Sequence, residues 1–181
     1  MGSDKGLLET EAKTWAQSAA NKLLAARLPV FYSVNPEQWN AYSSIFPSEQ
    51  LIKDSEDLSV NGPLLGVLSA HLQMPAEDFF VLACDMPLMN SSIIDKLKSA
   101  EEKNEGYDAY LFTNAGEPEP LSAIYKAVGL ARILSMYRSN QLKRHSMKFM
   151  LDHLKVYALQ IEDEEKQYFR NVNSHAELKG L

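Results

Sequence analysis

The chain has 181 residues, 45% of them hydrophobic and 23% charged, with a formal net charge of −6. This length predicts one domain over residues 1–181, and the ordinary hydrophobic content excludes a wholly disordered chain. The acidic balance argues against general nucleic-acid binding, and no apolar run is long enough for a membrane span. Cys84 is the one cysteine and no secretory leader is recognisable, so a cytoplasmic location is expected.

Apolar residues recur at helical spacing from Leu8 to Leu24 and predict a helix with one apolar face. Pro29 starts a short run of β-forming residues, and Gly62-Pro63 places a proline at the start of a later helix. The elements expected in this half are, in chain order, a helix at 9–26, a strand at 30–34, a helix at 36–44, a strand at 50–53 and a helix at 63–73.

The segment 79–84 is a continuous apolar run, which is typical of a strand covered on both faces. Asn90 is a predicted helix cap. The elements expected after it are, in chain order, a helix at 91–103, strands at 109–113 and 120–125, helices at about 127–138 and 146–153, strands at 155–161 and near Phe169, and a helix at 174–179. Alternating strands and helices predict an α/β fold with a parallel or mixed sheet, in which ligands bind at the carboxyl ends of the strands.

Asp85 follows the apolar run 79–84 directly, at the sheet edge where α/β folds place reactive groups. A carboxylate there suits Mg²⁺, which prefers oxygen ligands and is usually shared with substrate phosphates. The other interpretation is a turn or helix-capping aspartate before Pro87, and position alone leaves both open. Lys5 lies in a short glycine-containing segment ahead of a helix, where it either neutralises a phosphate or is a solvated N-terminal lysine.

Two further patterns could approach a ligand. Gly62 and Gly66 flank a turn, and they either admit a ligand or begin a helix with a packing glycine. Asn171 and Asn173 alternate, and they either present two amides to a heterocycle or phosphate or form a turn. Cys84 is expected in the core rather than as a nucleophile. The four histidines show no zinc-ligand spacing, and no P-loop or complete dinucleotide-binding motif is present.

Five segments follow one another in an order that is informative as a set. They are Met-Gly-Ser-Asp-Lys at 1–5, Gly-Pro-Leu-Leu-Gly at 62–66, Cys-Asp-Met-Pro at 84–87, Pro-Glu-Pro-Leu-Ser-Ala-Ile-Tyr at 118–125 and Phe-Arg-Asn-Val-Asn at 169–173. Together they cover nearly the whole chain and resemble the molybdenum cofactor guanylyltransferases, within the larger nucleotidyltransferase group. Each segment alone is weak, but five in sequence are fairly specific. The closing Asn-x-Asn and the Pro-x-Pro-Leu strand favour this family over nucleotidyltransferases that act on sugars or terpenoid precursors.

The resemblance implies a three-layer α/β sandwich with a mostly parallel, Rossmann-like nucleotidyltransferase sheet. It also implies transfer of GMP from GTP to molybdopterin or molybdenum-molybdopterin, with release of pyrophosphate. Mg²⁺ is the implied metal ion, with Mn²⁺ as a substitute. Proteins that deliver molybdopterin or accept the finished cofactor are the implied partners.

The resemblance also assigns roles residue by residue. Lys5 and Asp85 form the expected catalytic pair, in which Lys5 contacts the triphosphate and Asp85 holds the metal ion and the nucleotide phosphates. The other implied positions are Asn35, Asp57 (or Asp54) and Gly66 for the nucleotide, and Arg144, Asn171 and Asn173 for molybdopterin.

The sequence departs from the family pattern at its first residues. The family's opening strand and the Leu-Ala-Gly-Gly-x-Ser-x-Arg half of its signature are absent ahead of Met1, and the resemblance implies that this strand is central in the sheet. Three explanations are open: a start site placed too late or a shortened chain, a natural remnant that binds nucleotide weakly or not at all, or a partner chain that supplies the strand. Two other functions also remain, a related nucleotidyltransferase using CTP or another acceptor and a non-catalytic binding protein.

Overall fold

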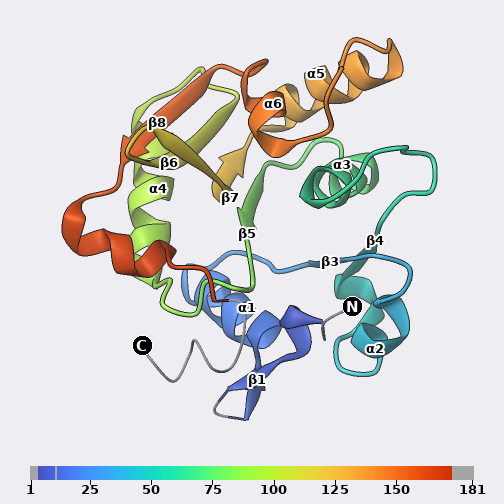
Figure 1. The fold of residues 1–181 in the computed structure, drawn as a ribbon, viewed down its shortest axis with the longest axis vertical. Helices are drawn as coiled ribbons and strands as arrows, with labels where there is room; N and C mark the ends of the chain where they lie inside the picture. The colour runs from blue at the N-terminus through green and yellow to red at the C-terminus, as the bar shows by residue number, and fades with distance from the viewer. Residues whose placement is uncertain (1–3, 11, 173–181) are drawn as a thin grey trace.

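The computed structural model describes residues 4–10 and 12–172, and it is an α/β structure with helices on both faces of a sheet (Figure 1). The strands are β1 (Glu9–Thr10), β2 (Lys13–Thr14), β3 (Tyr32–Val34), β4 (Leu51–Lys53), β5 (Phe79–Leu82), β6 (Ala109–Asn114), β7 (Glu117–Tyr125) and β8 (Val156–Gln160). The α-helices are α1 (Trp15–Ala25), α2 (Trp39–Ser43), α3 (Pro63–Gln73), α4 (Ser91–Lys103), α5 (Ala127–Arg138) and α6 (Met147–Leu151). Three 3₁₀ helices complete the described elements: η1 (Lys5–Leu7), η2 (Ser48–Gln50) and η3 (Asp163–Phe169).

The main sheet has four strands in the order β5-β7-β6-β8. Strand β7 runs antiparallel to both of its neighbours, and β8 runs parallel to β6. Strands β3 and β4 form a separate parallel pair, and β1 and β2 form a short antiparallel hairpin. The expected α/β fold is confirmed, with a mixed sheet in which β7 opposes the direction shared by β5, β6 and β8.

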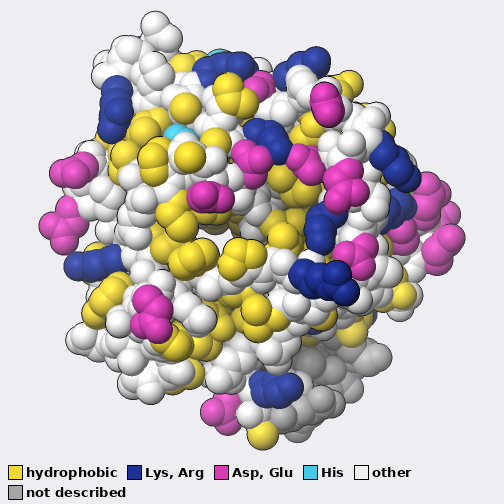
Figure 2. Space-filling model, turned by 180° about the vertical axis from the view of Figure 1, so that it is seen from behind, with side chains coloured by type: hydrophobic (Ala, Val, Ile, Leu, Met, Phe, Trp, Pro, Cys, Tyr) yellow, Lys and Arg dark blue, Asp and Glu magenta, His cyan; other side chains and the backbone are white. Residues whose placement is uncertain are grey.

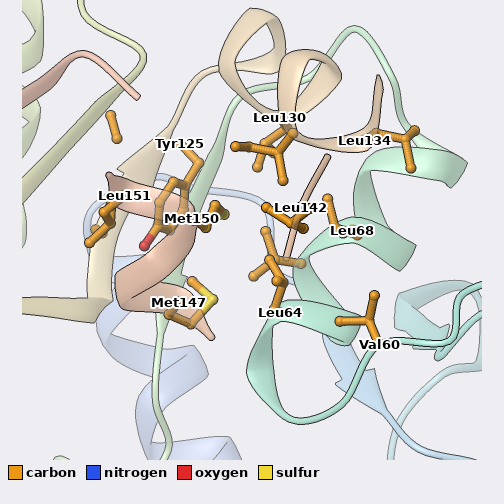
Figure 3. Packing of buried hydrophobic residues seen from close by; sticks show 14 of the residues in the cluster. Val60, Leu64, Leu68, Tyr125, Leu130, Leu134, Leu142, Met147, Met150 and Leu151 are labelled. Carbon is orange, nitrogen blue, oxygen red and sulfur yellow. The ribbon is translucent and has the colours of Figure 1, made fainter. Parts of the chain in front are cut away.

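Side chains of β6 alternate between two apolar clusters, one on each face of the sheet. Ala109 and Leu111 pack with helices α3, α5 and α6, where Leu64, Leu130 and Met150 meet (Figure 3). Tyr110 and Phe112 point to the other face and pack with α4 and η3. A fully buried Leu or Phe side chain contributes about 1.5–3 kcal/mol, so Leu111 and Phe112 hold β6 from both sides.

Three helices have the bounds that local sequence signals predict. Helix α3 begins at Pro63, helix α4 begins after the cap Asn90, whose side chain accepts from the Ile93 amide, and helix α5 spans 127–138. Proline at the first turn and asparagine at the cap satisfy or remove amides that have no partner within the helix.

The helix predicted over 9–26 is wrong at its N-terminal end, because α1 begins at Trp15. Thr14 caps α1 by accepting from the Gln17 amide at 3.1 Å, and the Gln17 side chain accepts from the Thr14 amide in return. This reciprocal cap fixes Trp15 as the first residue of the helix. The residues before it form the β1–β2 hairpin, with Ala12 at a φ of 61°. The helical spacing of apolar residues therefore continues on the N-terminal side of the true start of α1.

The strand predicted near Phe169 is also wrong, because the chain there forms η3. Glu162 caps η3 together with Glu165, and Glu165 also pairs with Lys96 of α4 at 2.7 Å. These contacts stabilise the 3₁₀ helix. Phe169 at its end packs in the apolar cluster beside Phe112. The helix predicted at 174–179 lies outside the described residues.

Within residues 4–10 and 12–172, no helix is both long enough and apolar enough to cross a membrane.

Gly129 of α5 lies against the start of β6. A Cβ at this position would lie 2.9 Å from the Cβ of Asp108 and 3.0 Å from the Asp108 carbonyl oxygen. Asp108 is itself fixed, since its carboxylate accepts from Arg132 at 2.6 Å and from the Lys155 amide at 2.8 Å. Glycine here permits the close approach of helix and strand.

We expect Gly129→Ala to lower the free energy of unfolding. The steric cost of about 1–3 kcal/mol outweighs the gain of about 0.8–1.0 kcal/mol from the better helix former. Urea denaturation followed by circular dichroism measures the change, with Ser135→Ala on the exposed side of α5 as the control. An unchanged or raised midpoint for Gly129→Ala would mean that the helix moves away at no cost.

Candidate active site

A cavity of about 1100 Å³ lies between β3 and β5. Helix α1 lines it with Ala16, Ala19, Ala20 and Leu23, and α3 lines it with Leu65, Gly66, Val67 and Ala70. Figure 2 shows a central opening rimmed largely by hydrophobic side chains, in agreement with this apolar lining. Among the polar lining residues, Glu77 and Asp78 lie just ahead of β5, whereas Asn35, Asp54 and Cys84 follow the carboxyl ends of β3, β4 and β5. Ligands of open α/β sheets bind at this end.

Lys5 and Asp85 meet just beyond the carboxyl end of β5, next to the lining residue Cys84 but outside the lining itself, although they are 80 residues apart in the chain. The Lys5 Nζ donates to Asp85 Oδ2 at 3.1 Å, with the lysine side chain 40% exposed and the aspartate side chain 22% exposed. A partly exposed ion pair contributes at most about 1 kcal/mol to stability. The pairing therefore contributes little stability, but it fixes the positions of the two charges. It brings together the two residues predicted to be catalytic.

Asp4 connects Lys5 to the end of β3, and sequence reasoning missed this role. Its Oδ1 accepts from the Gly6 amide at 2.9 Å and caps η1, while its Oδ2 accepts from Gln38 Nε2 at 2.8 Å. Gln38 and the predicted nucleotide-binding residue Asn35 exchange two hydrogen bonds of 2.9 Å. The Tyr42 hydroxyl also donates to Asp4 Oδ1 at 3.3 Å, and burial followed by the Asp4 charge raises the Tyr42 pKa.

Lys22 of α1 holds the loop that carries Asp85. Its ammonium donates to the Met86 carbonyl at 3.2 Å and to the Pro87 carbonyl at 2.7 Å. Burial lowers the pKa of Lys22 to about 8. A lysine within an amphipathic helix carries no signal of such a contact, because its partners lie 64 and 65 residues away.

The closing Asn-Val-Asn segment reaches the same loop. The Val172 amide donates to the Asp85 carbonyl oxygen at 2.9 Å, which places the exposed Asn171 directly beside that contact. Asn173, the second predicted asparagine, lies outside the described residues. The structure thus brings Asn171, Asp85 and Lys5 into one region.

The predicted nucleotide positions divide between the cavity and the surface. Gly66 lines the cavity, and a Cβ there would lie 2.4 Å from the Ser33 Oγ and 3.6 Å from Asp54 Oδ1. Asp54 also lines the cavity, where burial raises its pKa. Asp57 is exposed and is not among the lining residues, so the structure favours Asp54 of the two alternatives.

Arg144, predicted to contact molybdopterin, lies on the loop between α5 and α6. Its guanidinium carbon lies 5.9 Å from the centre of the Phe149 ring. This position is outside the residues that line the cavity, and its role stays a prediction.

Cys84 lines the cavity beside Asp85, but its chemistry is that of a protonated thiol. Burial raises its pKa to about 11, and the charges of Asp85 and Asp4 act in the same direction. A thiol with so high a pKa supplies almost no thiolate at neutral pH and is a poor nucleophile.

The donor set for a metal ion is a single carboxylate. Among the residues that the structure describes, no group of three His, Cys, Asp or Glu side chains could hold a metal ion. Mg²⁺ commonly binds through one or two carboxylates while substrate phosphates and water complete its coordination. Asp85, partly exposed directly after the lining residue Cys84, fits that mode of binding.

The pKa of Lys22 predicts a pH-dependent stability. The folded-state pKa of about 8 lies below the ordinary 10.5, so the unfolded chain binds more protons between these values and the unfolding free energy rises with pH there. We expect Lys22→Met to remove this rise, as measured by urea denaturation at several pH values between 8 and 10.5. The same exchange at the exposed Lys103 controls for the loss of one positive charge. Parallel pH profiles for the Lys22→Met and unaltered proteins would contradict the assignment.

Comparisons with known proteins find relatives over nearly the whole chain. The chain is 29% identical over 182 residues to a probable molybdenum cofactor guanylyltransferase of Geobacillus sp. (strain WCH70), a match that covers 99% of this chain and 90% of the relative. It is 26% identical to a protein of the same description from Flavobacterium johnsoniae, over 100% of this chain and 89% of the relative.

A solved structure has the same fold. The molybdopterin-guanine dinucleotide biosynthesis protein A of Archaeoglobus fulgidus superposes with a TM-score of 0.75 at 22% identity, over 97% of this chain and 87% of that one. The model of the family described as "MobA-like NTP transferase domain" matches residues 1–156 of this chain. Because this match spans most of the chain, the protein belongs to the MobA-like NTP transferase family.

Proposed function

We propose that this protein transfers GMP from GTP to molybdopterin, with or without bound molybdenum. In this reaction an oxygen of the molybdopterin phosphate attacks the α-phosphorus of GTP, and the bond to the departing pyrophosphate breaks. The observation that carries the proposal is the meeting of Lys5, Asp85 and Val172 at the carboxyl end of β5. Those residues come from three of the segments shared with the guanylyltransferases, and the relatives above are described by the same activity.

The residues of this chain bind and orient the reactants. Lys5 contacts the triphosphate, and Lys22 keeps the Asp85 loop in place through the Met86 and Pro87 carbonyls. Asp85 would hold Mg²⁺, or Mn²⁺ in its place, and the bound ion would neutralise phosphate charge. Phosphoryl transfer needs mainly positioning and charge neutralisation, so these roles are sufficient without a protein nucleophile.

The nucleotide and molybdopterin would contact different parts of the site. Asn35, Gly66 and Asp54 face the cavity beside the β3 and β4 ends and would contact the nucleotide. Asn171, beside the Val172–Asp85 hydrogen bond, would contact molybdopterin.

We expect Asp85→Asn to lower pyrophosphate release from GTP by about 10²-fold or more, because it removes the charge that faces Lys5 and the metal ion. Pyrophosphate release in the presence of molybdopterin and Mg²⁺ measures turnover, and calorimetric titration measures Mg²⁺-dependent GTP binding. Asp95→Asn on the exposed side of α4 is the matched control, and the urea midpoints of both variants report folding. Retained metal-dependent turnover in Asp85→Asn contradicts the metal assignment, and an absence of GTP binding by the unaltered chain contradicts nucleotide transfer.

Competition between GTP and CTP for binding tests which base the site prefers. A carboxylate such as Asp54 accepts the two neighbouring N–H groups on the guanine edge, a pattern that cytosine lacks. We expect GTP to bind at least about 10²-fold more tightly than CTP, because a site built for one hydrogen-bond pattern rejects another strongly. Asp54→Asn should reduce this preference. A preference for CTP would identify a different nucleotidyltransferase reaction.

A further inference from the structure

Gln38 joins two parts of the candidate site that are far apart in the chain. Its side-chain Oε1 accepts from the Asn35 amide at 2.9 Å, and its Nε2 donates to Asp4 Oδ2 at 2.8 Å. Asn35, which would contact the nucleotide, follows β3, whereas Asp4 directly precedes Lys5. One side chain therefore links the nucleotide side of the site to the segment that carries Lys5.

Helix capping does not explain a glutamine at this position. Gln38 is the N-cap residue of α2, but its side chain makes no capping hydrogen bond to that helix. Serine, threonine, aspartate and asparagine are the residues that usually cap helices. The two partners explain the glutamine, because a backbone amide only donates, a carboxylate only accepts, and a glutamine side chain does both. Glutamate would lose the donor, and lysine would lose the acceptor.

Asp4 passes this contact on to the turn that carries Lys5. Its second oxygen, Oδ1, accepts from the Gly6 amide at 2.9 Å and so caps η1, in which Lys5 is the first residue. A 3₁₀ helix of three residues has poor hydrogen-bond geometry, so η1 depends on contacts outside itself. Both carboxylate oxygens of Asp4 have partners, and these partners fix the direction of its side chain.

Tyr42 provides a second contact from α2 to the same turn. Its ring is buried and lies 5.6 Å from the Phe46 ring between centroids, and its hydroxyl donates to Asp4 Oδ1 at 3.3 Å. A Cβ at Gly6 would overlap the Tyr42 hydroxyl. The turn therefore lies directly against the Tyr42 side chain, at a distance that only glycine permits.

The position of this turn decides where the Lys5 ammonium lies. The Lys5 Nζ reaches Asp85 Oδ2 at 3.1 Å, with 40% of the lysine side chain exposed. A partly exposed ion pair holds a long side chain only weakly. The contacts of Asp4 and Gly6 with α2 supply a constraint that this ion pair lacks.

We propose that Gln38 is a positioning residue for the transfer reaction, and that through Asp4 it sets the place of Lys5 relative to a nucleotide bound beside Asn35. These residues and η1 then act as one hydrogen-bonded unit. Gln38 acts through Asp4 rather than on the phosphates. The effect on turnover rests on the proposed function, whereas the hydrogen-bonded bridge is present without nucleotide and is tested separately.

Reversing the polarity of the Gln38–Asp4 hydrogen bond tests the bridge. Gln38→Glu places two carboxylates opposite each other, and Asp4→Asn places two amide donors opposite each other. In the double variant the introduced amide donates to the introduced carboxylate. The remaining oxygens still accept from the Gly6 and Asn35 amides, so the bridge is rebuilt with the same atoms in reverse roles.

Two measurements are made on the full chain. Hydrogen exchange of the Gly6 amide, followed by NMR without nucleotide, reports the cap of η1, and the Ile93 amide, which Asn90 caps in the same way, is the internal reference. Pyrophosphate release with GTP, molybdopterin and Mg²⁺ gives kcat and the KM for GTP. Glu37→Gln and Asn40→Asp, at exposed positions beside Gln38, control for the loss and the gain of one negative charge.

We expect each single substitution to speed Gly6 exchange at least about fivefold and to leave Ile93 unchanged. We expect kcat to fall about tenfold or more while the KM for GTP changes less than about threefold, because a displaced Lys5 acts poorly in the transfer step. The double variant should return both values to within about threefold of the unaltered protein, a recovery that two independent losses of stability would not give.

Each other result contradicts a stated part of the inference. Unchanged Gly6 exchange in both single variants, or no recovery in the double variant, overturns the bridge. Faster exchange with a kcat equal to that of the controls overturns the positioning role. If the unaltered protein releases no pyrophosphate, the proposed function fails and the role of Gln38 in turnover fails with it, while the exchange data alone decide whether Gln38 holds η1.

Discussion

Strand β5 carries the Asp85 loop and also forms one wall of the apolar cavity, so the candidate site depends on how β5 is held. On one side β7 fixes it through a regular antiparallel ladder that continues to the Ala83–Leu121 hydrogen bond. Beyond its end, Lys22 holds the Met86 and Pro87 carbonyls, and the Val172 amide holds the Asp85 carbonyl. These contacts come from distant parts of the chain, so the position of the Asp85 loop depends on how α1, β7 and the segment around Val172 pack around β5.

Local signals were sufficient for much of the fold. The bounds of α3, α4 and α5 followed from Pro63, from Asn90 and from apolar spacing, because a helix depends on contacts within a few residues. The start of α1 was missed because the reciprocal cap of Thr14 and Gln17 competes with a helical apolar pattern that continues into the β1–β2 hairpin. Near Phe169 a capped acidic turn replaced the expected strand.

The candidate site was predictable in part. The position of Asp85 after an apolar strand and the family resemblance together indicated the Lys5–Asp85 pair, which the structure brings to 3.1 Å. The roles of Asp4 and Lys22 had no sequence signal, because each depends on partners between 34 and 65 residues away. Choosing between Asp54 and Asp57 likewise needed the fold, since only the course of the chain after β4 shows which carboxylate faces the cavity.

Among the residues that the structure describes, no strand pairs with the side of β5 opposite β7, and this edge bears on the behaviour of the chain in solution. An exposed edge with apolar side chains is a template on which another chain can add as a strand, and natural sheets protect such edges with charges, prolines or cover. The cavity-facing stretch 79–83 is Phe-Phe-Val-Leu-Ala, with no charge and no proline to block this pairing. Unless that edge is covered, we expect self-association through β5 to increase with protein concentration and to lower the amount of protein in solution.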